Sequence, residues 1–286
     1  MPVRNTATAR QLRLGAELRK LREQAGVSST EAGRLLGTSQ AQISNIEASR
    51  VGVSGDRVRA MARNYDCTDQ PLIDALADMA GERKGGWWEE YRETLPTGLV
   101  ELTELEHHAT ALHVAQVINI PGLLQTIDYA RAIFREAVPS LRAHDIEHRV
   151  SHRIKRQAIL HRDDPPPYTA IVHEAALRME FGGPSVAKAQ LDHLIEASTL
   201  DNVTVVVIPF GGTSFPSSGH GVDYLSGPVP QLDTVLLDVA QGGAQIDAAA
   251  KLKKYRLVLD RMEKVALSPT SSRDLIHRIA RATRGE

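Results

Sequence analysis

The sequence has a single cysteine, no long apolar run and almost no net charge. Cys67 stands alone among 286 residues, which excludes an internal disulfide and a cysteine-rich zinc site. No apolar run approaches the ~18 residues of a membrane span. Residues 1–10 lack the apolar core of a signal peptide. We therefore expect a cytoplasmic protein that does not associate with membranes.

The net charge of −1 is the sum of segments with different charges. Residues 1–66 contain 11 Lys and Arg against 6 Asp and Glu, a net charge of +5. Residues 67–106 contain 3 against 10, a net charge of −7, and the remainder carries +1. A basic first segment indicates a module that binds a polyanion such as nucleic acid. The length of 286 residues favours two domains over one.

The basic segment begins with two helical patterns. An amphipathic helix is predicted over residues 8–24, and Arg22 lies outside its apolar stripe. Ser28 and Glu31 have capping-box spacing, so a second and shorter helix is predicted to begin near Ser29.

A third helix is predicted within three residues of the second. Gly37 ends the second helix, and Ser39 with Gln42 forms another pair with cap spacing. Two short helices joined by so tight a turn cross steeply, which is helix-turn-helix geometry. Further helices are predicted over residues 54–64 and 71–81, so the first domain is expected to be a bundle of five helices.

The helix-turn-helix segment carries a recurring set of residues: Gly33, Gly37, Ser39, Ile43, Ser44, Ile46 and Glu47. With these residues the segment resembles the Cro/cI-repressor class, also called the xenobiotic-response-element (XRE) family, of helix-turn-helix domains. The resemblance implies a DNA-binding domain over residues 1–81. Two residues depart from the family pattern, because Gly33 stands where alanine is usual and Ser49 stands where glycine is usual.

The polar side of the third helix offers groups that could read bases. Gln40 and Asn45 each present a donor and an acceptor, which match the major-groove edge of adenine. They lie ~140° apart around the helix and would reach different parts of a site. The alternative interpretation is that the polar side of this helix is only a solvated surface of a helical bundle. The predicted contacts to double-stranded DNA come from Ser39, Gln40, Gln42, Ser44 and Asn45, with Arg50, Arg10 and the helix start at Ser29 and Thr30 as phosphate contacts.

A glycine-rich and charged segment, residues 81–86, marks a domain boundary. We predict a first domain over residues 1–81, a linker over 82–98 and a second domain over 99–286. Trp87 and Trp88 follow the boundary beside acidic residues. They fit either a helix start packed on the second domain or an aromatic anchor for a partner.

The second half mixes helical and strand patterns. Residues 203–210 are apolar on both faces, which predicts a central strand. Further strands are predicted over 168–173 and 234–240, and helices over 99–112, around 129–133, and over 140–160, 186–197, 245–266 and 272–283. Residues 211–221 are predicted to form a loop, with the role of a lid over a pocket as one interpretation. The expected fold class is mainly α, with a five-helix helix-turn-helix bundle and a mixed α/β second domain that contains a small sheet.

The second half also carries a distinctive set of motifs. They are the PGLLQT-x-x-YARA run at 121–132, Arg153-x-x-Arg156-Gln157, Glu174-x-x-Leu177, Gly182-Gly183, Gln190-Leu191-x-x-Leu194, Val207-x-Pro209 and Ala266-Leu267-Ser268. Together they resemble the uncharacterised C-terminal domain of actinobacterial WhiJ-like regulators. The resemblance implies a transcription factor controlled by a metabolite or by a small acidic partner protein encoded nearby. The predicted partner or effector residues are Trp87, Trp88, Leu123, Leu124 and Tyr129.

No motif in the sequence supports catalysis, a metal site or a cofactor. His144, His148 and His152 have metal-ligand spacing, but arginines lie beside them, so surface histidines are the better interpretation. His173-Glu174 begins like the zinc-protease motif, yet Leu177 replaces its second histidine. We therefore expect a homodimeric DNA-binding regulator rather than an enzyme. The alternative is a protein-interaction module, antitoxin-like or sequestering, that binds a small partner protein.

Overall fold

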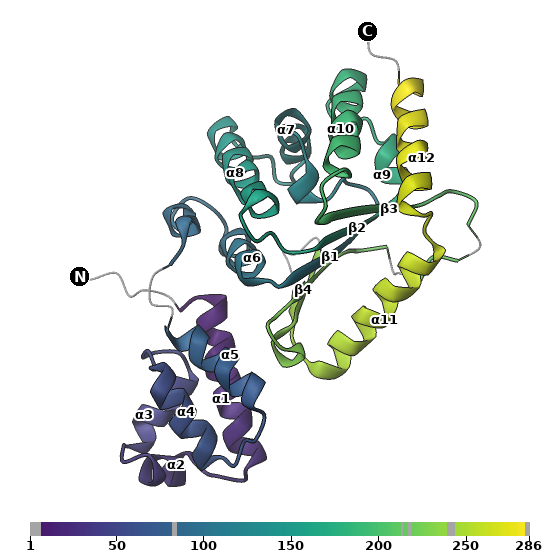
Figure 1. Cartoon of the computed structure of the whole chain (residues 1–286). Helices are drawn as coiled ribbons and strands as arrows, with labels where there is room; N and C mark the ends of the chain where they lie inside the picture. Colours follow the sequence, from purple (N-terminus) through teal and green to yellow (C-terminus); the bar gives the residue numbers. More distant parts are fainter. Residues whose placement is uncertain (1–6, 82–84, 213, 217–218, 239–243, 284–286) are drawn as a thin grey trace. The chain divides into compact units, whose positions relative to one another are not determined.

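The computed structural model describes residues 7–81, 85–212, 214–216, 219–238 and 244–283 (Figure 1). The chain divides into two compact units, residues 1–89 and residues 90–286. The boundary lies inside the predicted linker segment, of which residues 82–84 are outside the described part. The helix-turn-helix pattern belongs to the first unit, and all described strands belong to the second.

The described residues of the first unit form the five predicted helices. They are α1 (Ala9–Gln24), α2 (Ser29–Leu35), α3 (Gln40–Glu47), α4 (Gly55–Asn64) and α5 (Gln70–Gly81). Each begins after a side chain whose oxygen accepts a hydrogen bond from a first-turn amide: Thr8, Ser28, Ser39, Ser54 and Asp69. Side chains from α1, α3, α4 and α5 meet in one core, where Leu18, Ile43, Met61 and Leu76 are fully buried.

The turn between α2 and α3 passes very close to Gly33. A Cβ atom at this position would lie 2.8 Å from the Thr38 carbonyl oxygen and 3.0 Å from the Gln40 amide nitrogen. Gly37 has a φ angle of 62°, a conformation that favours glycine, and reverses the chain. The departure from alanine at Gly33 is thus explained by the close approach of the turn.

The described residues of the second unit form one six-stranded sheet. In chain order its strands are β1 (Ala111–Gln116), β2 (Tyr168–His173), β3 (Val203–Ile208), β4 (Gly221–Ser226), β5 (Thr234–Asp238) and β6 (Ala244–Ile246). The order across the sheet is β3-β2-β1-β4-β5-β6. Strands β1, β2 and β3 are parallel, whereas β4, β5 and β6 are antiparallel to their neighbours. The predicted mixed α/β class is confirmed.

Helices cover both faces of this sheet. One face carries α6 (Thr97–His108), α7 (Ile127–Arg135), α8 (Ala143–Arg156), α9 (Glu174–Arg178), α10 (Pro184–Ala197) and α12 (Pro269–Ala282), and the other carries α11 (Ala249–Val265) (Figure 1). Short 3-10 helices are η1 (Trp87–Tyr91), η2 (Gly122–Leu124), η3 (Gln157–His161) and η4 (Pro230–Leu232). Alternate residues of β3 divide between two cores, Val205 and Val207 in one and Val206 and Ile208 in the other.

Strand β3 was predicted to be central but lies at one edge of the sheet. Its apolar pattern reflects cover on both faces rather than a strand on each side. The edge is closed by the start of α12, where the Ser272 hydroxyl accepts a hydrogen bond from the Val207 amide at 2.9 Å. The Leu267 amide donates to the Val207 carbonyl, also at 2.9 Å. These two hydrogen bonds take the place of some of those that a further strand would make at this edge.

Three strands differ from the sequence prediction. The helix predicted over 99–112 ends at His108, and Leu112 lies in β1 instead. Residues 244–246 pair with β5, so the helix predicted from residue 245 begins at Ala249. Strand β4 begins at Gly221, at the end of the predicted loop 211–221, in which residues 213, 217 and 218 lie outside the described part. Residues 239–240 of the predicted last strand are also outside it.

Replacement of Gly33 by alanine should destabilise the first unit. Helix propensity alone favours alanine by ~1 kcal/mol, but the new Cβ would press on the Thr38 carbonyl and separate α2 from α3. We expect a lower melting temperature of the full chain in circular dichroism. Gly52→Ala is the control, because a Cβ there meets nothing within 4 Å. A Gly33→Ala variant as stable as the Gly52→Ala variant would contradict this account.

Candidate nucleic-acid interface

Helix α3 has a polar face opposite two buried isoleucines, Ile43 and Ile46. The outward positions are the exposed Gln40, Ala41 and Gln42 and the half-buried Ser44 and Asn45. At ~100° per residue, Gln40 and Ser44 lie on one flank and Gln42 and Asn45 on the other. The structure therefore brings the predicted base-reading residues together on a single helix, on two flanks.

The amide side chains on this face are available for recognition. Within the described part of the chain, the side chains of Gln40, Gln42 and Asn45 make no hydrogen bond to the protein. Ser39 differs, since its hydroxyl accepts a hydrogen bond from the Gln42 amide at 3.1 Å and caps α3. Free carboxamides offer a donor and an acceptor together, which is the pattern that reads adenine in the major groove.

Ala41 is a further residue of this face that residue type alone does not indicate. It is exposed and lies between the two flanks, opposite the buried side of α3. A methyl group there lets the helix approach base edges closely and can contact a thymine methyl group. A helical projection centred away from Ile43 and Ile46 would have found it.

The predicted phosphate contacts lie on three different segments. Arg50 is exposed after α3, Arg10 is half-buried in α1, Thr30 is exposed in α2 and Ser29 is half-buried beside it. The Ser28 hydroxyl accepts a hydrogen bond from the Glu31 amide at 3.1 Å and so caps the third amide of α2. The first two amides of that helix, those of Ser29 and Thr30, are not part of this cap.

The loop after α3 is held against α1 by Ser49. Its φ angle of 53° lies in the left-handed region that favours glycine. The Ser49 hydroxyl donates a hydrogen bond to the Gln11 carbonyl oxygen at 2.7 Å. At the same contact, a Cβ on Gly15 would lie 2.5 Å from the Glu47 carbonyl oxygen. The serine thus adopts this turn and bonds the loop to α1.

A buried ion pair joins α1 to the end of α3. Arg22 Nε lies 2.6 Å from Glu47 Oε1 and Nη2 lies 2.9 Å from Oε2, while Nη1 donates to the Val27 carbonyl at 2.9 Å. Hydrogen bonding to Glu47 raises the pKa of Arg22 above its usual value. The sequence pattern left Arg22 outside the apolar stripe of its helix, but the structure buries it because Glu47 supplies a partner.

The predicted partner or effector residues of the PGLLQT segment lie in the core of the second unit. Leu123 is 4% exposed, and Leu124 and Tyr129 are each 1% exposed. The Tyr129 hydroxyl accepts a hydrogen bond from the Ile120 amide at 3.2 Å. Gln190 donates to the Leu124 carbonyl at 2.7 Å. This segment is built into the fold and offers no apolar docking surface made of these side chains.

Trp87 and Trp88 lie in η1 with their rings in an edge-to-face arrangement and their centroids 6.2 Å apart. Trp88 is buried, whereas Trp87 is half-buried. Of the two, Trp87 is therefore the one that keeps surface for a partner.

The three histidines of α8 do not act as one group. His152 is buried, and its Nε2 lies 2.9 Å from Thr103 Oγ1 on α6. Burial, with a contribution from Arg156, lowers the pKa of His152 to about 3. His144 and His148 are exposed. The described residues contain no group of three or more potential metal ligands, and none of their helices is long and apolar enough to cross a membrane.

Two known domain families match the chain. The first, described as a domain of unknown function (DUF5753), matches residues 99–278, which is more than half of the chain. The second, described as a helix-turn-helix domain, matches residues 13–76. No curated protein and no solved structure matches the chain. The helix-turn-helix match contains α2, the turn and α3, so it covers the polar face described above.

Glu47→Gln should destabilise the first unit by ~3–5 kcal/mol, because Arg22 would keep a buried charge without its partner. Urea denaturation of the full chain measures this change. Glu31→Gln is the matched control, since it breaks an exposed pair with Arg34 on α2 and does not touch Arg22. We expect the control to leave the denaturation midpoint almost unchanged. Equal effects of the two substitutions would contradict a structural role for the buried pair.

Proposed function

The chain belongs to the DUF5753 family and carries a helix-turn-helix domain, and we propose that it is a sequence-specific DNA-binding transcriptional regulator. The observation that carries the proposal is the α3 face, where exposed carboxamides without partners in the described protein stand over a buried apolar core. Regulation of transcription is the ordinary consequence of such a DNA-binding module.

The finer assignment is to the Cro/cI-like, or XRE, class. Its support is the short α2–turn–α3 unit, with Gly33 at the close approach and Glu47 in a buried ion pair. A regulator of this kind acts as a homodimer on a pseudo-palindromic operator. The half-sites would then lie about 10 bp, or a multiple of it, apart.

Control of DNA binding is assigned to the second unit, as the WhiJ-like resemblance implies. The unit is a separate compact body with its own sheet and cores, which suits a sensor joined to a DNA-binding module. The controlling molecule is a metabolite or a small partner protein. The proposal contains no catalytic step.

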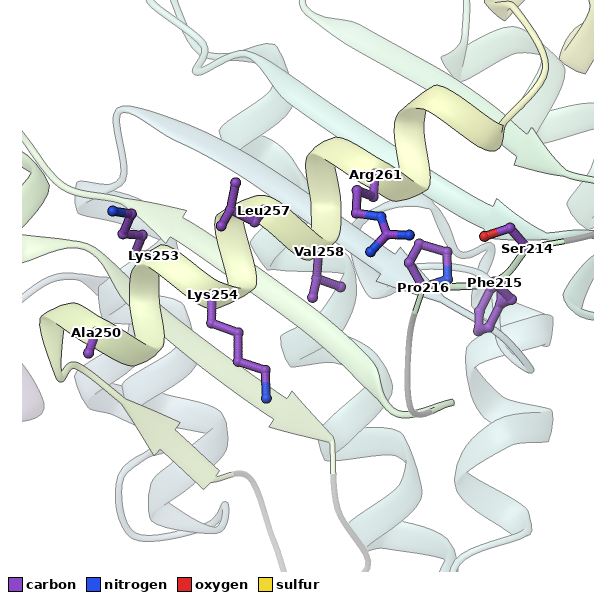
Figure 2. Close-up of a pocket in the computed structure, with 9 residues that line it drawn as sticks. All are labelled: Ser214, Phe215, Pro216, Ala250, Lys253, Lys254, Leu257, Val258 and Arg261. Carbon is purple, nitrogen blue, oxygen red and sulfur yellow. The ribbon is translucent and has the colours of Figure 1, made fainter.

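The alternative function is a protein-interaction module, antitoxin-like or sequestering, that binds a small acidic partner. A groove on α11 favours it (Figure 2). The groove has a volume of about 560 Å³ and is lined by Lys253, Lys254 and Arg261 together with apolar Leu257, Val258, Phe215 and Pro216. Figure 2 shows the two lysines along one end of α11 and Arg261 toward the 214–216 segment. A basic rim beside exposed apolar surface complements an acidic protein.

Gln40→Ala should relax specificity at one base pair by ~1–3 kcal/mol, whereas Arg50→Ala should weaken binding to every sequence alike. Gel-shift titrations with promoter DNA and with scrambled duplexes at one moderate salt concentration separate the two effects. Lys188→Ala, an exposed change on α10 of the second unit, is the control and should alter neither. Equal affinity of the wild-type chain for every duplex would overturn sequence-specific recognition.

If the groove binds a small acidic protein, the double change Lys253→Glu and Lys254→Glu should abolish its capture by the full chain. Charge reversal replaces attraction with repulsion at the rim. The assay is a pull-down with the purified neighbour-encoded protein, and Lys188→Glu is the control. Capture that survives the double change would place the partner elsewhere.

A further inference from the structure

Helix α11 carries an excess of positive charge. Its sequence contains six Lys and Arg against one Asp and one Glu, a net charge of +4. Arg256 is paired, since its Nη2 lies 2.8 Å from Tyr224 Oη and 2.5 Å from Asp233 Oδ2. In contrast, three exposed cations of the same helix form no ion pair within the described part of the chain: Lys253, Lys254 and Arg261. Their charge is therefore available to an anion from outside the chain.

These three cations line the groove of about 560 Å³ on α11. Figure 2 shows Lys254, Val258 and Arg261 along one side of the helix, with Arg261 toward the 214–216 segment. Val258 and Phe215 both pack against the core beneath α11, so the groove has an apolar base. No aspartate or glutamate is among its described lining residues. The groove thus combines apolar surface with positive charge alone.

The wall of the groove across from α11 is held by the end of strand β2. The ring of Phe215 meets that of His173 edge to face, with the centroids 5.4 Å apart, and Phe210 meets His173 in the same manner at 5.2 Å. His173 is itself fixed, because its Nδ1 accepts a hydrogen bond from the Ala175 amide at 3.1 Å. The apolar wall is therefore an anchored part of the second unit.

The size of the groove favours a small molecule as its occupant. Nine residues line it, and its volume lies within the ~300–1,000 Å³ of ordinary ligand pockets. A stable protein interface uses ~20–30 residues on each side, so a protein partner would have to cover much surface outside the groove. A second copy of α11 would bring like charges together.

We propose that the groove on α11 binds an amphipathic organic anion, a carboxylate or phosphate attached to an apolar body. Arg261 holds the acidic group, and the apolar body packs between Val258 and the wall formed by Phe215 and Pro216. This inference rests on the proposed function in one respect, that the bound anion then serves as the metabolite that controls DNA binding.

The cations of the groove have different roles in this arrangement. The planar guanidinium of Arg261 can donate two parallel hydrogen bonds to a carboxylate or phosphate, which fixes the acidic group. Lys254 lies one turn from Val258 on the other side from Arg261, and Lys253 is its neighbour. Their ammonium groups raise the local concentration of anions at the entrance but impose less geometry.

The test is a fluorescence titration of the full-length chain with anilinonaphthalene sulfonate, an amphipathic anion whose emission rises in apolar surroundings. We expect saturable binding to a single site. Replacement of Arg261 by methionine should weaken this binding about tenfold or more, because it removes the charged hydrogen bonds and keeps an apolar stem. Replacement of Lys254 by methionine should weaken it less.

Lys264→Met is the matched control. Lys264 is an exposed cation of α11, one turn after Arg261, and it does not line the groove. This variant should bind the dye as the wild-type chain does. The dye also binds loosened proteins, so all variants are compared by thermal melting in circular dichroism. Arg261 is exposed, and its replacement should leave the melting temperature unchanged.

Competition identifies the chemistry of the ligand. Decanoate or decyl phosphate, below the concentration at which they form micelles, should displace the dye. Acetate, which lacks the apolar body, and decyltrimethylammonium, which has the opposite charge, should not displace it at the same concentration. Displacement by decanoate alone or by decyl phosphate alone identifies the acidic group and supports the proposal.

Three results would overturn the proposal: no saturable dye binding, equal binding by the Arg261→Met variant, or displacement by acetate or decyltrimethylammonium as effective as that by the long-chain anions. If the dye does not bind but a protein is captured through Lys253 and Lys254, the groove is a protein interface instead. No DNA is present in the titration, so its failure leaves operator recognition untouched.

Discussion

The buried ion pair between Arg22 and Glu47 fixes the position of the recognition helix, and the proposed reading of DNA depends on it. Two nearly parallel hydrogen bonds orient the end of α3 against α1 in a way that apolar packing alone would not. Gly15 leaves room for this contact, and Ser49 bonds the following loop to α1. The side chains of α3 can therefore point outward in a fixed arrangement, which base recognition requires.

The second unit contains a similar pair, Arg156 with Glu106. Where both partners are present, the buried charges hold α6 to α8.

Signals local in sequence were the ones that predicted structure. The cap at Ser39 and the polar face with Gln40 depend on neighbours a few residues away. The helices of the first unit and the candidate base contacts could therefore be predicted from the sequence. The partner of Arg22 lies 25 residues further along the chain, so the burial of Arg22 could not be predicted from its neighbours in the sequence. In the sequence, Leu112 continues the helical spacing of the apolar residues before it. In the structure, its pairing with β2 places it in a strand. Strand β4 was not predicted, because the charge of Asp223 does not suggest a buried strand. The contacts that bury this carboxyl come from residues distant in the sequence.

The central claim is that α3 reads a specific operator, and selection of duplexes from a randomised DNA pool by the full-length chain tests it most directly. The account predicts enrichment of one motif, with two related half-sites centred about 10 bp or a multiple of it apart. Bound and scrambled duplexes should then differ in affinity by about 10³ or more at physiological salt. A pool that shows no enriched motif after repeated selection would contradict the claim.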